Sequence, residues 1–260
     1  MGDEPVLLAQ GVTKRFGGLA ALDAISLAIA PGEVRGLIGP NGAGKTTLVN
    51  VLSGVLRPTA GSIRFAGHEV AGSAPHRIAR LGVRRTFQTL RLFPEMSVVE
   101  NVAVGYHAHT RAEAWDALLG TRRAAREENE TLTRAREALA FVGLQAGPDL
   151  PARALAYGQQ RLLEIARALV AGPKLMLLDE PAAGMNPAEC NHLLGLIRRL
   201  HRQNITLLVI EHRMDLIMEA CDRITVLNYG QNLAEGTPGE IQANPAVVEA
   251  YLGTYARAGA

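Results

Sequence analysis

Cysteine is scarce in this chain of 260 residues, because only Cys190 and Cys221 are present. The two do not form a pair with metal-ligand spacing, and the start of the chain, Met1-Gly2-Asp3-Glu4-Pro5, lacks the basic-then-apolar form of a signal peptide. The sequence therefore gives no sign of a disulfide framework or a zinc site. We expect a reduced, cytosolic setting.

Long apolar runs and a strong net charge are also missing. No run approaches the roughly 20 apolar residues that a membrane-spanning helix needs. If the protein acts at a membrane, a partner must supply the spans. The net charge of +2 and the absence of a long basic run give no argument for nucleic-acid binding. With 48% hydrophobic residues, the chain has enough apolar material for one large or two modest domains.

A glycine-rich segment, Gly39-Pro40-Asn41-Gly42-Ala43-Gly44-Lys45-Thr46-Thr47, separates an apolar run (Val34–Ile38) from a helix-forming run (46–52). Such a turn directs backbone N–H groups into a concavity at a helix N-terminus, where anions bind. In this pattern the lysine reaches the terminal phosphates of a nucleotide and the next hydroxyl, here Thr46, ligates Mg²⁺. The alternative is a simple strand-to-helix turn, but the complete pattern is rare by chance.

Two carboxylates follow a second apolar run, Leu175–Leu178, because Asp179 ends the run and Glu180 comes next. Ligands of open α/β sheets bind at the carboxyl ends of the strands. We therefore expect Asp179 to hold Mg²⁺, directly or through water, and Glu180 to orient or deprotonate the attacking water. Asp-Glu-Pro on its own is common in turns, so this interpretation depends on the phosphate loop upstream.

Two further polar residues follow runs that resemble strands. Gln88 comes after 83–87, and its amide can bind Mg²⁺ or position water. His212 comes after Ile205–Ile210 and can donate a hydrogen bond to a γ-phosphate. Without the motifs around them, both would be interpreted as ordinary surface residues.

A second anion site is predicted at Leu155–Gln159, which precedes a run with helical periodicity (160–170). One chain thus has two phosphate-binding helix ends. A compact arrangement is two chains facing head to tail, so that each ATP is held by the phosphate loop of one chain and the second site of the other.

The apolar pattern predicts an α/β fold. Short strands joined by turns fill 6–38, a hairpin follows at 57–70, and the chain becomes helical from about 94 to 172. Further along, the pattern predicts a βαβ crossover and a hairpin with its turn at Tyr229-Gly230. The individual helices are expected from Ser97, over 112–119, over 121–142, after Asn186-Pro187 and after Asn244-Pro245.

In order and spacing, these motifs resemble the ATP-binding cassette (ABC) family over essentially the whole chain. The resemblance implies a P-loop NTPase fold: a RecA-like core with an antiparallel β subdomain and an inserted α-helical subdomain. Residues 1–260 would form one nucleotide-binding domain. Its catalytic core and β subdomain would comprise 6–93 and 173–236, its helical subdomain 94–172 and its helical tail 237–260.

The resemblance also implies roles for single residues. Glu180 would be the catalytic base, His212 would sense the γ-phosphate, and Gln88 would contribute to catalysis. Phe16 would stack on adenine, and Leu155–Gln159 would be the signature that closes the ATP site of a partner chain. The implied set for ATP is Phe16, Gly39, Pro40, Asn41, Gly42, Ala43, Gly44, Lys45, Thr46, Thr47, Ala156, Tyr157, Gly158, Gln159 and Asn186, and for Mg²⁺ it is Thr46, Gln88 and Asp179.

Four positions depart from the usual family pattern. The signature usually reads Leu-Ser-Gly-Gly-Gln, but Ala156 lacks the serine hydroxyl and Tyr157 replaces a glycine. Backbone N–H groups near Gly158 survive, so we expect a weaker but functional phosphate contact. Asn186 stands where aspartate is usual. Phe16 stands where tyrosine is commoner, which stacking tolerates.

These departures, together with the tail segments 235–238 and 250–253, resemble the ATPase subunits of branched-chain amino acid importers. The resemblance implies that ATP hydrolysis powers uptake across the inner membrane, with this protein peripheral on the cytoplasmic face. Its partners would be permease subunits, which Leu90–Phe93 would contact, and a second ATPase chain of the same or another kind. A periplasmic binding protein would be an indirect partner, and no nucleic acid is expected. The insert around 107–133 fits the first of the two ATPases of such importers.

Two alternatives stay open from the sequence. One is the ATPase of a related ABC system, for urea or amide import or for lipopolysaccharide export. The other, from a different class, is a soluble cassette ATPase that acts as a conformational switch in DNA repair or translation.

Overall fold

The computed structural model describes residues 4–106 and 122–258, so the helix expected over 112–119 lies outside the described residues. The chain forms two compact units. The first unit comprises Met1–Arg85, Lys174–Ala183 and Pro187–Ala260, and the second comprises Thr86–Pro173 and Gly184–Asn186. Within the described ranges, every helix is too short or too polar to cross a lipid bilayer.

A six-stranded sheet forms the centre of the first unit, in the order β10-β9-β3-β8-β7-β6. Neighbouring strands are parallel except for β9 and β10, which form the expected hairpin with positive φ at Tyr229 and Gly230. β3, β7 and β8 are buried along their whole length, as expected for parallel strands covered on both faces. The bounds are β3 (Val34–Ile38), β6 (Val83–Arg85), β7 (Leu175–Asp179), β8 (Thr206–Ile210), β9 (Arg223–Asn228) and β10 (Gln231–Gly236).

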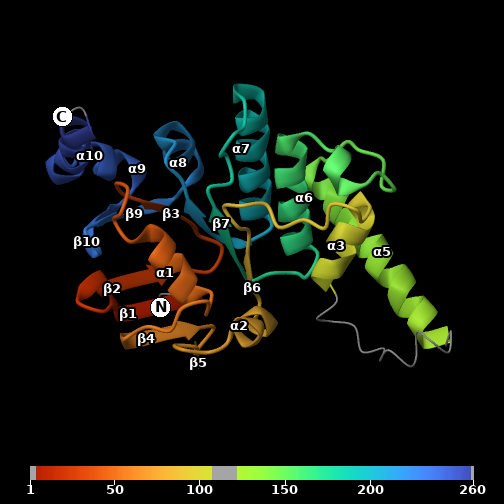
Figure 1. Cartoon of the computed structure of the whole chain (residues 1–260), viewed down its shortest axis with the longest axis horizontal. Coiled ribbons are helices and arrows are strands. Elements are labelled where there is room, and N and C mark those ends of the chain that lie inside the picture. Colours follow the sequence, from red (N-terminus) through yellow and green to blue (C-terminus); the bar gives the residue numbers. More distant parts are fainter. Residues whose placement is uncertain (1–3, 107–121, 259–260) are drawn as a thin grey trace. The chain divides into compact units, whose positions relative to one another are not determined.

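A four-stranded antiparallel sheet, in the order β2-β1-β4-β5, belongs to the same unit (Figure 1). One apolar core includes Ile25 of β2, Leu48 of helix α1 and Leu208 of β8, so both sheets and α1 pack around shared side chains. This packing fixes the phosphate loop, whose last three residues begin α1. The bounds are β1 (Leu7–Phe16), β2 (Leu19–Ile29), β4 (Ala60–Phe65), β5 (His68–Glu69) and α1 (Lys45–Leu52).

The remaining helices of the first unit follow the predicted starts. α7 begins at Pro187 and buries one face, including Leu193, Ile197 and Leu200, and its position between β7 and β8 confirms the βαβ crossover. α10 begins at Pro245, as predicted. The bounds are α2 (Pro75–Leu81), α7 (Pro187–Arg202), α8 (Met214–Ala220), α9 (Pro238–Gln242) and α10 (Pro245–Ala258).

Helices make up most of the second unit: α3 (Val98–Tyr106), α5 (Arg122–Val142) and α6 (Tyr157–Leu169). Ser97 caps α3 as predicted, because Glu100 accepts the Ser97 N–H at 2.7 Å and the Ser97 hydroxyl accepts the Glu100 N–H at 3.3 Å. Helices α3 and α6 approach so closely at Gly105 that an added Cβ would lie 2.1 Å from the Arg167 carbonyl oxygen.

Candidate functional site

The phosphate loop, residues 39–47, joins β3 to α1. Gly44 precedes α1 in the left-handed conformation (φ 102°), and a Cβ there would lie 2.7 Å from the Ala21 carbonyl oxygen. Among the described residues, no side chain caps this helix end. The first N–H groups of α1 are therefore left for an anion.

Lys45 is the first residue of α1 and is 7% exposed. Its Nζ donates to the carbonyl oxygens of Gly39 at 2.6 Å and Pro40 at 3.0 Å. Burial lowers the pKa of Lys45, whereas the nearby carboxylates of Glu180 and Asp179 raise it. The lysine, both carboxylates and the loop thus belong to one electrostatic environment in the first unit.

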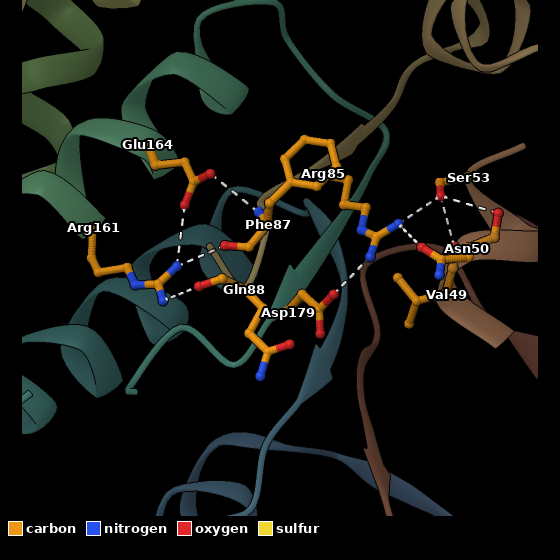
Figure 2. Close-up of polar contacts among 9 residues, drawn as sticks. All are labelled: Val49, Asn50, Ser53, Arg85, Phe87, Gln88, Arg161, Glu164 and Asp179. Carbon is orange, nitrogen blue, oxygen red and sulfur yellow. Dashed lines mark hydrogen bonds and ion pairs between the residues drawn. The ribbon is translucent and has the colours of Figure 1, made fainter. Parts of the chain in front are cut away.

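Asp179 ends β7 and is 3% exposed. Its Oδ2 accepts a hydrogen bond from Arg85 Nη2 at 2.8 Å, and Arg85 Nη1 donates to Asn50 Oδ1 at 2.6 Å and Ser53 Oγ at 3.1 Å (Figure 2). Arg85 therefore connects β6, β7 and the region of α1. The sequence patterns did not single out Arg85; the available signal was an arginine at the carboxyl end of a short strand.

Glu180 lies one residue beyond β7 and adopts a left-handed backbone conformation (φ 49°), which is rare for a residue with a side chain. Its N–H donates to the Ile210 carbonyl oxygen at 2.9 Å, and its Oε1 lies 3.0 Å from His212 Nε2. The structure therefore brings together the two residues that sequence analysis expected to act on water and on the γ-phosphate.

Glu211, between β8 and His212, was also missed. It is 3% exposed and accepts the Ala182 N–H at 2.6 Å and the His212 N–H at 3.1 Å. Burial raises the pKa of Glu211, although the hydrogen bonds from the backbone act against this. Its contacts fix the segments after β7 and β8, and the signal for it was an acid directly after a buried strand.

Phe16 ends β1 and is 47% exposed, with Lys14 Nζ 5.0 Å from its ring centroid. An exposed aromatic ring of this kind is free to stack on a base.

The signature residues lie in the second unit. Ala156 precedes α6, where the Gln159 Oε1 accepts its N–H at 3.1 Å, and Gly158 is buried. The Tyr157 ring packs on Gly184, because a Cβ at Gly184 would lie 2.8 Å from the ring. Asn186 is exposed and directly precedes α7.

Gln88 is also in the second unit and is exposed. The strand expected over 83–87 ends at Arg85, because the backbone of Phe87 bonds to side chains of α6 instead of to a strand. Glu164 Oε1 accepts the Phe87 N–H at 3.1 Å, and Arg161 donates to the carbonyl oxygens of Phe87 at 2.7 Å and Gln88 at 2.5 Å (Figure 2).

The donors of the first unit suit a magnesium nucleotide. An uncapped helix end and a buried ammonium group match phosphate oxygens, and the Thr46 hydroxyl and Asp179 carboxylate are oxygen ligands of the kind that Mg²⁺ prefers. The first unit holds the phosphate loop, Asp179, Glu180, His212 and Phe16, and the second holds Gln88, the signature residues and Asn186. The roles of these residues stay predictions.

Comparison with family models gives two matches. Residues 22–183 match the model described as ABC transporter, and residues 231–257 match the model described as branched-chain amino acid ATP-binding cassette transporter.

Similar curated proteins carry related names. The chain is 47% identical to the high-affinity branched-chain amino acid transport ATP-binding protein BraF of Pseudomonas aeruginosa, with 96% of this chain and 98% of that protein covered. It is also 47% identical to LivG of Escherichia coli K12, a protein of the same description, with the same coverage. A probable LivG of Archaeoglobus fulgidus is 37% identical, with 95% of each chain covered.

Among solved structures, the ADP conformation of MJ1267, an ATP-binding cassette of an ABC transporter, is similar with a TM-score of 0.83 and 34% identity. The match covers 96% of this chain and 99% of that one. A dimeric structure of the ATP-binding cassette MJ0796, bound to ADP and phosphate, is similar in fold, with a TM-score of 0.76 and 24% identity over 89% of this chain and 98% of that one.

Proposed function

The chain belongs to the ABC transporter family, and we propose that its first-unit site hydrolyses ATP through Glu180 to power uptake of branched-chain amino acids. The protein is the ATP-binding subunit of a branched-chain amino acid importer. The observation that carries the residue assignment is the Glu180–His212 contact at 3.0 Å, in the same unit as the buried Lys45 and Asp179.

The geometry supports a division of work among these side chains. Lys45 and the N–H groups at the start of α1 bind the phosphates of ATP. The Glu180 carboxylate accepts the proton of the attacking water, and His212, whose Nε2 contacts Glu180 here, donates that N–H to the γ-phosphate instead when ATP is bound. The strained backbone of Glu180 and the hydrogen bonds of Glu211 hold this pair in place.

Mg²⁺ is the second group that the site suits. When bound, it neutralises charge that develops on the phosphates during transfer. Thr46 and Asp179 of the first unit would hold it. Gln88, in the second unit, stays a predicted catalytic residue. In the first unit, Arg85 orients the Asp179 carboxylate by binding its Oδ2.

We further propose the partners of a complete importer. The relatives are named as transport ATP-binding proteins, so permease subunits would supply the membrane spans. A second ATPase chain, identical or different, would place its signature on this chain's ATP; the cassette MJ0796, which has a similar fold, is dimeric. The protein would then lie on the cytoplasmic face of the inner membrane, with a periplasmic binding protein as an indirect partner.

The substrate class has its own support. The curated relatives BraF and LivG are named as branched-chain amino acid transport proteins, and residues 231–257 match the model of branched-chain amino acid ATP-binding cassette transporters. These findings favour branched-chain amino acids over urea, amides or lipopolysaccharide, and favour transport over the DNA repair or translation alternative.

Replacing the proposed base tests the assignment. Glu180→Gln keeps the size of the side chain but removes its basicity, so ATP turnover should fall by about 10²- to 10⁴-fold while ATP still binds. Phosphate release assays and fluorescent-ATP titration measure the two quantities. Near-normal turnover would remove Glu180 from the role of base. As a matched control, Glu189→Gln on α7 of the same unit should leave turnover unchanged.

A further inference from the structure

Helix α6 buries two charged side chains. Arg161 and Glu164, one helical turn apart, are each 2% exposed, and Arg161 Nη1 lies 3.4 Å from Glu164 Oε2. Burial raises the pKa of Glu164, which the Phe87 N–H and the Arg161 and Arg167 cations oppose. Taking two charges out of water is costly, and packing alone would be served as well by apolar side chains. The groups that hydrogen-bond to Arg161 and Glu164 therefore indicate the function of these two side chains.

The partners are mostly main-chain groups of the segment 87–91, which contains Gln88. Arg161 donates to the carbonyl oxygens of Phe87 and Gln88, and Glu164 accepts the Phe87 N–H. One turn further on, Arg167 donates to the Arg91 carbonyl oxygen. Side chains of α6 thus fix the backbone on both sides of Gln88. Figure 2 shows the contacts to Phe87 and Gln88.

The same arginine also contacts the signature. Arg161 Nη2 donates to the Tyr157 hydroxyl at 2.9 Å, and its guanidinium lies 5.4 Å from the Tyr157 ring centroid. Tyr157 in turn packs on Gly184, at the start of the segment 184–186. A glycine at position 157, as in the usual signature, would provide neither contact.

We propose that Arg161 is a positioning residue that fixes Gln88 to the signature helix, and that Tyr157 extends this connection to the segment 184–186. The three parts of the second unit that the family resemblance assigns to ATP or Mg²⁺, namely Gln88, the signature and Asn186, then move as one body. This inference rests on the proposed function, because Gln88 matters only if the chain hydrolyses ATP.

The geometry requires an arginine. A planar guanidinium binds two carbonyl oxygens and a hydroxyl at once, whereas a lysine ammonium is a single point charge. Arg161→Lys keeps the charge beside Glu164 but loses the simultaneous contacts. A paired replacement, Arg161→Met with Glu164→Leu, removes both charges and leaves neither buried alone, so it is expected to fold.

The first measurement needs no hydrolysis. In amide hydrogen exchange of the full chain, the peptide containing Phe87 and Gln88 should exchange about tenfold faster in both variants, with peptides from β3 and β8 unchanged. Arg134→Lys, which alters an exposed pair on α5 of the same unit, serves as the control and should leave this peptide unchanged. Equal protection of the peptide in wild type and variants would overturn the inference.

The second measurement is a double-mutant cycle on ATP turnover in the assembled transporter. Arg161→Lys should lower kcat by about tenfold with the KM for ATP within about twofold. Adding Gln88→Ala should lower kcat little further, because both changes remove the same contribution, that of a correctly placed Gln88. If the kcat losses of the two single variants multiply in the double variant, Arg161 acts only on general stability and the inference is overturned. A wild-type protein that hydrolyses no ATP would contradict the proposed function instead, leaving the exchange result to decide on Arg161.

Discussion

Each charged side chain of the first-unit site has a neighbour that fixes it. Lys45 reaches the backbone of its own loop, Asp179 is bound by Arg85, and Glu180 lies against His212. Glu211 differs, because its carboxylate is buried and its partners there are mainly backbone N–H groups. Because of that difference, we expect the protonation of Glu211 to change the free energy of unfolding measurably.

We predict a pH-dependent effect of Glu211→Gln. Burial raises the pKa of Glu211 above its ordinary value of 4.5, so the folded chain binds this proton more tightly than the unfolded chain. Stability must then fall as pH rises from the unfolded pKa toward the folded one. Glutamine still accepts the Ala182 N–H but has no charge to desolvate. Relative to the variant, the wild type should therefore lose free energy of unfolding as the pH rises above 4.5, as urea denaturation can measure.

Glu240→Gln is the matched control with the opposite sign. Hydrogen bonds from Thr237 lower the pKa of Glu240, so its contribution is present above the unfolded pKa and is lost as pH falls. A Glu211→Gln difference that stays constant with pH would contradict the account of the buried carboxylate.

The sequence predicted those site residues that belong to a local pattern. The phosphate loop and Asp179-Glu180 come at the ends of apolar runs, His212 lies one residue beyond another, and parallel strands place their carboxyl ends at one edge of a sheet. Glu211 directly follows an apolar run and was nevertheless missed, whereas Arg85, Arg161 and Glu164 could not be found in this way. Their partners are distant in sequence, and charged residues of that kind usually lie on the surface.

At the scale of elements, Arg85 connects three of them. It leaves the end of β6, binds Asp179 at the end of β7 and contacts Asn50 and Ser53 around the end of α1. Both members of the ion pair are nearly buried, with side-chain exposures of 9% and 5%. Arg85 thereby holds α1, the helix that begins in the phosphate loop, and β7, the strand that carries Asp179, in one arrangement.

Arg85→Gln should destabilise the chain strongly. It leaves Asp179 buried without the Arg85 cation, which typically costs about 3–5 kcal/mol in free energy of unfolding. Chemical denaturation measures this loss. Arg198→Gln removes the exposed pair with Glu219 in the same unit and should cost less than about 1 kcal/mol. Equal losses for the two variants would show that the Arg85 ion pair adds nothing to the fold.

The elements themselves were largely predictable. Buried parallel strands have continuous apolar runs, and Pro187, Pro245 and the Ser97 capping box mark helix starts, so β3, β7, β8, α3, α7 and α10 lie where the sequence indicates. The end of β6 was wrong by two residues, because side chains of α6 capture the backbone of Phe87. On α6, Leu162 and Leu169 are half-buried, whereas Arg161 and Glu164 are buried.

For the whole molecule, the signature and the phosphate loop lie in different compact units. In the proposed assembly a signature completes the ATP site of another chain, so ATP should bring two chains together whenever hydrolysis is blocked. The domain division predicted from the sequence stays a prediction. The sequence could not show that 86–93 and 184–186 belong to the same unit as α3, α5 and α6, since this grouping arises from contacts with α6.

ATP should therefore dimerise the Glu180→Gln chain. Light scattering should give about twice the chain mass of 27.7 kDa with Mg²⁺-ATP, either alone or after mixing with the second ATPase chain. Dimerisation only in the mixture would identify the pair as different chains. Lys45→Met in the same background should stay monomeric. A monomer under every condition would contradict the two-chain site.

Uptake by the reconstituted importer tests the central claim most directly. Proteoliposomes containing the permeases, both ATPase chains and the binding protein should accumulate labelled leucine when ATP is enclosed, whereas urea should not be accumulated. Glu180→Gln in this chain should reduce the initial rate of leucine uptake by at least about tenfold, since turnover falls by more than that. Leucine uptake that continues at the wild-type rate with Glu180→Gln would contradict the account.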